Sequence, residues 1–352
     1  MQQLATSENK GSIMPNDPGE LTLKQPTGCT EKTVTNETPS PPIAPSKRLN
    51  ADLVFKAVTA AFAFSILLIL ALMTLEMVKE SLPAIKAFGW KFAGSSDWDA
   101  VQGIFGALPY IWGSVVSSLL ALALATPLSV GTALFVTEIA PKRFGGAVAA
   151  LVELLAAIPS VIYGLWGILV MAPWLQQTVQ PFLSDHLGFL PFFQGAPYGV
   201  SMLAAVFILM IMVVPIITSI TKEVLLAVPQ SQREAAIALG ATRWEMIRMA
   251  VLPYGRSGIL GAVILGLGRA IGETMAVTMV IGNTPQISLS LLSPAYTMPS
   301  VIANEFAETT SKLHASALME IGLLLLVVTL VINVMARLLL WGMTRQAAGG
   351  AK

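Results

Sequence analysis

The chain has 352 residues, of which 55% are apolar and only 12% are charged, and its formal net charge is +1. Soluble domains usually carry about 25% charged residues, so this composition predicts a protein embedded in lipid. The nearly neutral charge gives no indication of nucleic-acid binding. The single Cys29 excludes an internal disulfide. His186 and His314 lie too far apart to indicate a metal site, and we interpret them as loop or helix-end residues.

The first part of the chain differs from the rest. Residues 1–50 are rich in Ser, Thr, Pro, Asn and Glu and show no apolar periodicity, which predicts a disordered tail. No apolar segment follows Met1 directly, so we expect no cleaved signal peptide.

Long apolar segments follow, each near or above the roughly 20 residues that a helix needs to cross a bilayer. They cover 53–78, 107–137, 147–174, 199–221, 257–283 and 315–341. The alternation typical of a β-barrel is missing. We therefore expect an all-α integral membrane protein with six transmembrane helices over residues 51–345, followed by a short tail over 346–352. Three prolines inside these segments, Pro127, Pro159 and Pro215, predict kinks, as in a transport path.

The basic residues of the connections predict the orientation. If the N-terminus lies in the cytoplasm, the outside connections contain only Lys79, Lys86, Lys91 and Lys312, and most other Lys and Arg residues flank the inside ends. Positive charge favours the cytoplasmic side. We expect a multi-pass protein of the cell inner membrane with both termini in the cytoplasm.

The longest inside connection, about 222–256, predicts two short helices. Ser231 with Glu234, and Thr242 with Glu245, have the spacing of capping boxes at helix starts. Gly240 lies between them, where a left-handed residue ends a helix. We expect Leu252-Pro253 to end the second helix. A compact helix pair outside the bilayer is suited to docking on a soluble partner.

The loop resembles the EAA loop of ABC-importer permeases through Glu234, Ala235, Ala236, Gly240, Leu252 and Pro253. That family usually has Ile two positions before Leu-Pro, where this chain has Ala250. The resemblance implies a type I permease fold whose cytoplasmic coupling helices contact ATPase subunits.

The fifth apolar segment contains Arg269 and Glu273. Charges inside a membrane span are costly and usually mark a substrate route or an internal ion pair. Their spacing of four places them on one helix face, where they can pair. A guanidinium offers a planar set of donors suited to an anion such as phosphate. We expect Arg269 to meet an anionic substrate and Glu273 to hold the guanidinium until it arrives; an ion pair that only locks helices together is the alternative.

The runs Gly268–Thr278 and Ala157–Gly167 resemble the permeases of Pst phosphate importers, especially the PstC type. The resemblance covers about 53–343 and places Thr274 with Arg269 and Glu273 on the substrate path. It implies ATP-driven inward movement of inorganic phosphate. It also implies a PstA-type permease subunit, a dimer of PstB-type ATPases and a PstS-type phosphate-binding protein as partners. ATP and Mg would then be bound by the ATPase, and this chain would need no cofactor of its own.

Two related alternatives stay open. One is a PstA-type subunit, which shares much of this pattern, and the other is a permease for another oxyanion such as sulfate or molybdate. An ion-coupled secondary transporter would need no coupling loop and would often show inverted repeats. An enzyme would need a nucleophile with a base, or metal ligands, and the chain has no such set and no Walker A motif. We predict a transport subunit that does not hydrolyse ATP itself.

Overall fold

The computed structural model describes residues 48–309 and 311–349. Nearly all of the predicted tail over 1–50 lies outside these residues. The chain divides into two units, residues 1–62 and 63–352. The described part of the first unit is the beginning of α1 (Arg48–Phe88).

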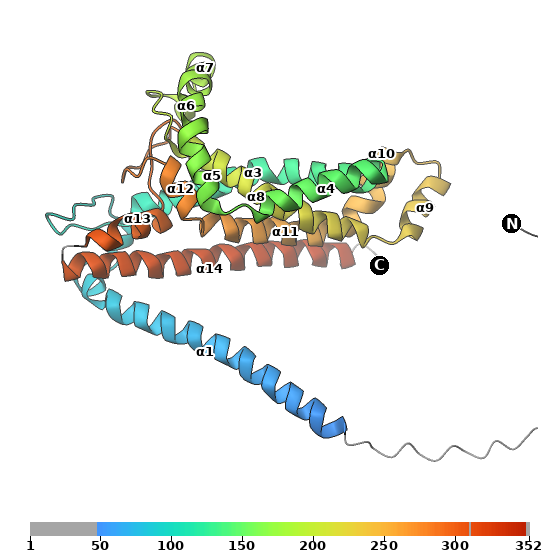
Figure 1. Ribbon diagram of the computed structural model, residues 1–352, viewed down its shortest axis with the longest axis horizontal. Coiled ribbons are helices and arrows are strands. Elements are labelled where there is room, and N and C mark those ends of the chain that lie inside the picture. The colour runs from blue at the N-terminus through green and yellow to red at the C-terminus, as the bar shows by residue number, and fades with distance from the viewer. Residues whose placement is uncertain (1–47, 310, 350–352) are drawn as a thin grey trace, which may run out of the picture. The chain divides into compact units, whose positions relative to one another are not determined.

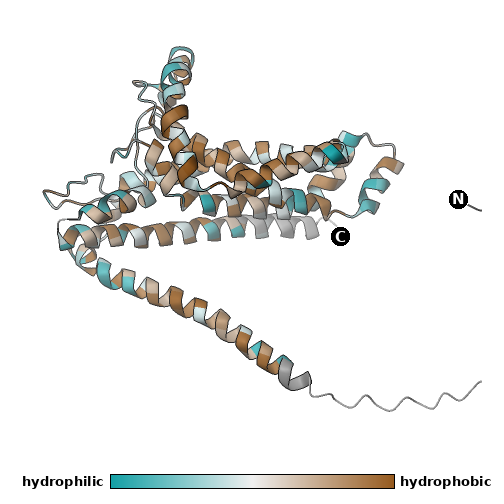
Figure 2. Ribbon diagram, viewed as in Figure 1, coloured by the Kyte–Doolittle hydropathy of each residue, from teal (hydrophilic) through white to brown (hydrophobic). Residues whose placement is uncertain are grey.

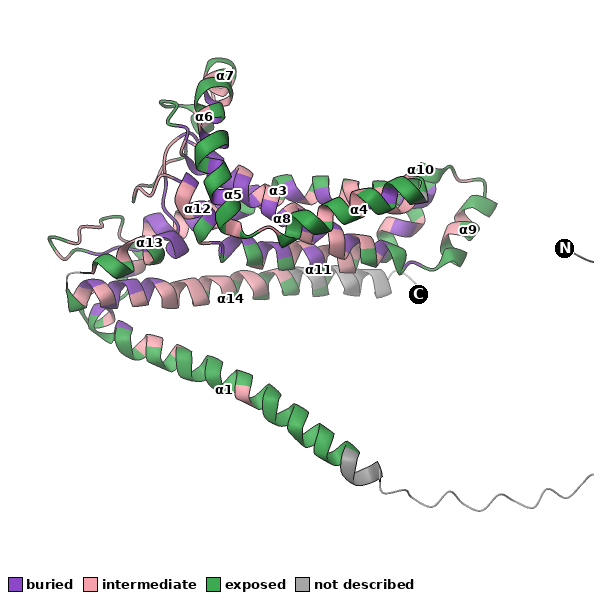
Figure 3. Cartoon of the chain, viewed as in Figure 1, coloured by how far each residue is buried: buried purple, intermediate pink, exposed green. Residues whose placement is uncertain are grey.

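The first predicted span is a long helix with an outward apolar surface. The stretch Asp52–Phe88 of α1 is long and apolar enough to cross a membrane, and its most apolar window has no buried residue. Figure 2 shows this helix as largely hydrophobic, and Figure 3 shows it as largely exposed. An exposed surface of this kind is stable in lipid but not in water.

Four long helices form the framework of the second unit. They are α3 (Leu108–Leu134), α8 (Met202–Leu226), α11 (Leu252–Ile271) and α14 (Lys312–Gly349). α3 packs along α8, α8 along α11, and α11 along α14 (Figure 1). Ala121 and Ala125 of α3 are fully buried in the core that α3 shares with α8. Small residues let membrane helices approach closely.

The described residues contain no β-strand, and shorter elements connect the long helices. These shorter elements are α2 (Lys91–Gly94), η1 (Phe135–Ile139), α4 (Lys142–Ala157), α5 (Ser160–Trp166), η2 (Gly167–Met171), α6 (Ala172–Trp174), η3 (Leu175–Val179), α7 (Gln180–Leu187), η4 (Pro191–Phe193), α9 (Gln230–Ala238), α10 (Arg243–Met246), η5 (Ile247–Val251), α12 (Met275–Val280), α13 (Met298–Glu305) and η6 (Phe306–Glu308).

The third predicted span, 147–174, is not one kinked helix as expected. The helices on either side of Ile158 and Pro159 meet at 91°. Proline lacks a backbone N–H and disfavours helical backbone in the residue before it, and Ile158 is extended, with ψ of 128°. Pro127 and Pro215, in contrast, lie within α3 and α8, which continue past them.

The predicted membrane class is confirmed. Within the described residues, five helices are long and apolar enough to cross a membrane, or six if the bent pair counts as one crossing. The fifth predicted span, 257–283, is wrong as a single helix, because α11 ends at Ile271 and α12 begins at Met275. The break places Glu273 and Thr274 between two helices, and the predicted substrate residues therefore lie at a helix end.

Gly113 of α3 permits a close helix–loop contact. A Cβ atom at this position would lie 2.1 Å from the carbonyl oxygen of Tyr296. We expect Gly113→Ala to lower the stability of the folded chain by about 2 kcal/mol, because the backbone would have to move apart. Thermal unfolding of the purified protein in detergent measures this loss.

The matched control is Gly131→Ala in the same helix, where a Cβ would have no heavy atom within 4 Å. We expect this change to be neutral or slightly stabilising, since alanine favours helix over glycine. Equal melting temperatures for the two variants would contradict the close-contact interpretation.

Candidate functional site

The predicted coupling loop forms a helix, a glycine turn and a second helix. α9 is followed by Gly240, whose φ of +84° is the left-handed conformation that glycine adopts easily. The second capping box is confirmed: Thr242 N donates to Glu245 Oε2 at 2.8 Å, and Glu245 N donates to Thr242 Oγ1 at 3.4 Å. The turn between the helices is therefore set by local sequence.

The first predicted capping box is wrong. The residue before α9 is Pro229, and Ser231 lies inside the helix without a side-chain cap. Glu234 is exposed, and no ion pair joins it to another residue in the described ranges. Its carboxylate is free for a partner.

The predicted helix end at Leu252-Pro253 is also wrong. Arg243–Ile271 is one candidate span that continues through both residues. The π-helical turn η5 directly precedes Leu252, and Pro253 lies in the first turn of α11. Within this continuous helix Pro253 directly follows the π-helical turn, where the altered hydrogen-bond pattern accommodates the missing proline N–H. The coupling loop therefore leads without interruption into the helix that carries Arg269.

A groove of about 480 Å³ lies on the coupling loop, and its lining includes Ala235, Ala236 and Gly240. Leu239, which also lines it, is 90% exposed. Alanine and glycine leave room for the side chain of a partner. Leu252 faces inward instead and packs against the small apolar core that includes Val228 and Val251, so the structure separates it from the groove.

An ion pair that the sequence analysis missed holds α9 in place. Arg233 Nη2 lies 2.9 Å from Glu138 Oε1, and the two side chains are 13% and 7% exposed. The guanidinium also donates to the carbonyl oxygens of Leu225 and Val228. Glu138 belongs to η1, which continues α3, so this pair joins the loop to the end of a long helix. No local pattern connects two residues 95 positions apart.

The predicted pair in the fifth segment is formed at the helix break. Arg269 Nη1 lies 2.8 Å from Glu273 Oε2, with side-chain exposures of 45% and 3%. Glu273 Oε1 also accepts the backbone N–H of Ala276 at 3.3 Å, in the first turn of α12. The hydroxyl of Thr274 lies 3.5 Å from the carbonyl oxygen of Gly272, at the same break. The carboxylate is buried, but much of the guanidinium remains accessible.

Arg269 lines a pocket of about 600 Å³ between three of the long helices. The other lining residues are Ile216 of α8, Gly261, Ile264, Leu265 and Gly268 of α11, and Asn333 and Arg337 of α14. None of these lining residues is acidic. The accessible guanidinium donors of Arg269 therefore face a space that favours an anion.

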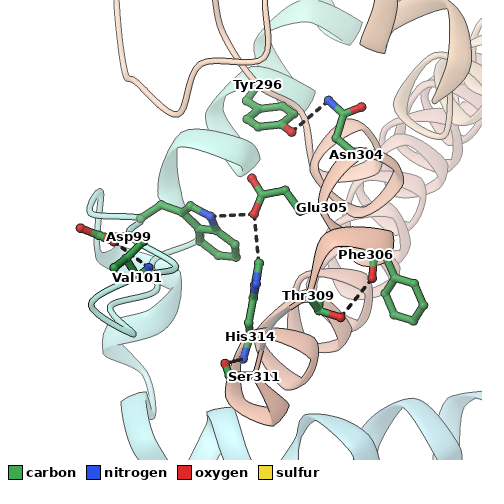
Figure 4. Close-up of polar contacts among 10 residues, drawn as sticks. Asp99, Val101, Tyr296, Asn304, Glu305, Phe306, Thr309, Ser311 and His314 are labelled. Carbon is green, nitrogen blue, oxygen red and sulfur yellow. Dashed lines mark hydrogen bonds and ion pairs between the residues drawn. The ribbon is translucent and has the colours of Figure 1, made fainter.

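A second polar cluster surrounds Glu305 at the junction of α13 and α14 (Figure 4). Glu305 Oε2 accepts the Trp98 indole N–H at 3.0 Å and lies 3.1 Å from His314 Nε2. Nearby, Asn304 donates to the hydroxyl of Tyr296, and burial raises the pKa of that hydroxyl to about 12. His314 is at a helix end as expected, but it is only 4% exposed, a burial that the sequence did not indicate. Within the described residues, no three His, Cys, Asp or Glu side chains are grouped to hold a metal.

Removing Glu138 tests the contact between α9 and α3. We expect Glu138→Ala to lower the free energy of unfolding by about 3 kcal/mol, because Arg233 would keep a poorly solvated, unpaired charge. Arg243→Ala, on the neighbouring α10, serves as the charge-removal control. Similar losses of stability in both variants would contradict a special role for the buried pair.

Removing Glu305 tests the second cluster. Glu305→Ala leaves the Trp98 indole and His314 without their acceptor, and we expect a loss of about 2 kcal/mol in stability. Glu308→Ala, in the adjacent η6, is the control. Detergent-solubilised protein heated in steps and analysed by size exclusion gives the comparison, and an unchanged midpoint for Glu305→Ala would show that the cluster contributes little.

Comparisons with known proteins agree with this architecture. A family model described as "Binding-protein-dependent transport system inner membrane component" matches residues 125–343. The chain is 45% identical over 293 residues to "Phosphate transport system permease protein PstC" of Mesorhizobium japonicum, covering 82% of this chain and 90% of that protein. It is 44% identical over 322 residues to the protein of the same name in Xylella fastidiosa (strain 9a5c), covering 90% and 99%.

The fold has a solved counterpart. A chain in the crystal structure of a bacterial ABC transporter involved in the import of the acidic polysaccharide alginate superimposes with a TM-score of 0.55 at 18% identity, covering 85% of this chain and 100% of that one. This similarity shows the fold of ABC-importer permeases. Together with the family match and the high identity to the relatives, it leads to one assignment: the chain belongs to the binding-protein-dependent transport system inner membrane components, as a permease of the PstC family.

Proposed function

We propose that this chain is the subunit of an ABC importer through which inorganic phosphate crosses the cell inner membrane, driven by ATP that a partner subunit hydrolyses. Relatives that carry the name of phosphate transport permeases match most of its length. The observation that carries the proposal is the half-exposed guanidinium of Arg269, held by buried Glu273 beside a pocket without acidic lining residues.

The ion pair of Arg269 and Glu273 provides an anion-binding site on the proposed path, and its two charges cancel when no anion is bound. Glu273 balances the charge of Arg269 at 2.8 Å, which lowers the cost of placing a cation inside a membrane span. The guanidinium has five N–H donors, and those not used by Glu273 are available to phosphate oxygens. An arriving anion then competes with the carboxylate for the guanidinium. Thr274, at the same helix break, is the neighbouring hydroxyl on this proposed path.

A continuous helix connects this site to the coupling loop. From Arg243 to Arg269 the chain stays helical, a distance of about 39 Å at 1.5 Å per residue. A partner ATPase that docks at Glu234, Ala235, Ala236 and Gly240 would displace the start of this helix. The displacement would reach the Arg269 end, because a packed helix moves as a unit.

The assembly that follows has four kinds of component. A PstA-type permease lies beside this chain, a dimer of PstB-type ATPases binds ATP and Mg beneath the coupling loops, and a PstS-type protein delivers phosphate at the outer face. Both termini of this chain lie in the cytoplasm, in agreement with the distribution of basic residues. Binding of ATP to the ATPase dimer favours one conformation of the permease, open to one side of the membrane, and release of the nucleotide favours the conformation open to the other side.

Uptake of labelled phosphate tests the role of Arg269. In cells that lack the gene, we expect wild type to restore uptake at micromolar phosphate and Arg269→Ala to abolish it, since the anion loses its guanidinium donors. Sulfate uptake is the control for substrate. Loss of sulfate uptake with normal phosphate uptake in the deletion would overturn the phosphate assignment and leave the permease assignment in place.

Arg269→Ala alone leaves Glu273 as a buried unpaired charge, which is strongly destabilising. The double change Arg269→Ala with Glu273→Gln removes both charges and separates folding from transport. We expect this variant to assemble with its partners and still fail to transport. Normal phosphate uptake by the double variant would show that the ion pair only locks the helices together.

A further inference from the structure

The pocket beside Arg269 contains a second guanidinium that the sequence pattern did not assign. Arg337 and Asn333 of α14 line it together with Arg269 of α11. Residues four positions apart share one helix face, so the amide and the guanidinium present adjacent donors to the same space. Ile264 and Leu265 supply apolar lining residues beside these donors.

Arg337 differs from Arg269 in its charge balance. Glu273 neutralises Arg269, whereas in the described part of the chain no carboxylate lies within ion-pair distance of Arg337. Arg337 is the next-to-last residue of the apolar stretch Lys312–Leu338 of α14, and it is exposed. A cation near a helix end can extend its charged group into water, so its donors are available to an anion from outside the chain.

The two cations lie at different levels of the pocket. Its α11 residues run from Gly261 to Arg269, about 12 Å along the helix axis. α14 runs antiparallel beside α11 (Figure 1). Arg337 is nearer the C-terminal end of α14 than Asn333, so it lies toward the Gly261 end, on the side of the coupling loop. In the proposed orientation that is the cytoplasmic side.

We propose that Arg337 and Asn333 form a second anion-binding station, which takes phosphate from Arg269 and releases it toward the cytoplasm. This inference rests on the proposed function. The lining of the pocket includes one positive charge without a carboxylate partner among the described residues, that of Arg337, at its inner end. A phosphate that separates Arg269 from Glu273 therefore moves toward a cation that has no competing carboxylate.

Transport kinetics test the station in the complete complex with its ATPase and binding protein. We expect Arg337→Gln to lower the maximal rate of phosphate uptake about tenfold, the effect of one lost charge-assisted hydrogen bond. The external phosphate concentration for half-maximal uptake should not change, because capture takes place on the binding protein. Arg337→Lys should recover most of the rate, since it keeps the charge. Lys312→Gln, at the other end of α14 and outside the pocket, is the control and should transport normally.

A direct occupancy measurement distinguishes transported phosphate from the headgroup of a lipid, which has the same chemistry. Leu265 lines the pocket and is 58% exposed. In a Cys29→Ser background, Leu265→Cys should react with a water-soluble methanethiosulfonate reagent, and added inorganic phosphate should slow the reaction. Adding Arg337→Gln should remove this protection.

Each contrary result has a definite meaning. Equal maximal rates for Arg337→Gln and wild type, or phosphate protection that survives Arg337→Gln, would overturn the station. Failure of free phosphate to protect Leu265→Cys in the parent chain would also overturn it, as expected if a lipid headgroup fills the pocket. If the complex with the unchanged chain transported no phosphate at all, the proposed function itself would be wrong. This result differs from those that overturn only the station at Arg337.

Discussion

A carboxylate buried to 3% exposure in an apolar membrane protein needs a cation, and Glu273 obtains it from Arg269. The same carboxylate accepts a backbone N–H of α12, so it also stabilises the chain where α11 has ended. This carboxylate therefore stabilises the helix break and also orients the guanidinium of Arg269. That contact fixes the guanidinium of Arg269 beside the pocket and balances its charge, and it leaves the other guanidinium donors accessible.

The coupling loop and the pocket are connected by one continuous helix. α10, η5 and α11 form one helical path from the loop to Arg269, and the buried pair of Arg233 and Glu138 holds α9 against the end of α3. The loop that contains Gly240 is thus attached to two long helices, α3 and α11, which pack against each other and against α8. Such an arrangement favours movement of packed units over local bending.

Two prolines show why local sequence was insufficient for the helix boundaries. At Pro159 the chain turns by 91°, whereas at Pro253 it continues as a helix. After Pro159, Gly164 and Gly167 let α5 and η2 approach α12 so closely that added Cβ atoms would lie 2.6 Å from Met279 Sδ and 2.7 Å from Val280 Cγ1. Pro159 follows an extended residue, whereas Pro253 follows the π-helical turn η5, so the surrounding backbone decides whether a proline ends a helix.

The sequence by itself determined the features that depend on neighbours along the chain: lipid-length apolar segments, the Gly240 turn, the Thr242 capping box and the pairing of Arg269 with Glu273 four residues on. It also carried the family resemblance, through motifs of fixed spacing. Only the tertiary structure decided which distant residues meet. Arg233 reaches Glu138 across 95 positions, and Trp98 reaches Glu305 across 207. Arg337 shares a pocket with Arg269. These contacts depend on how whole helices pack, and helix periodicity contains no information about the partner on another helix.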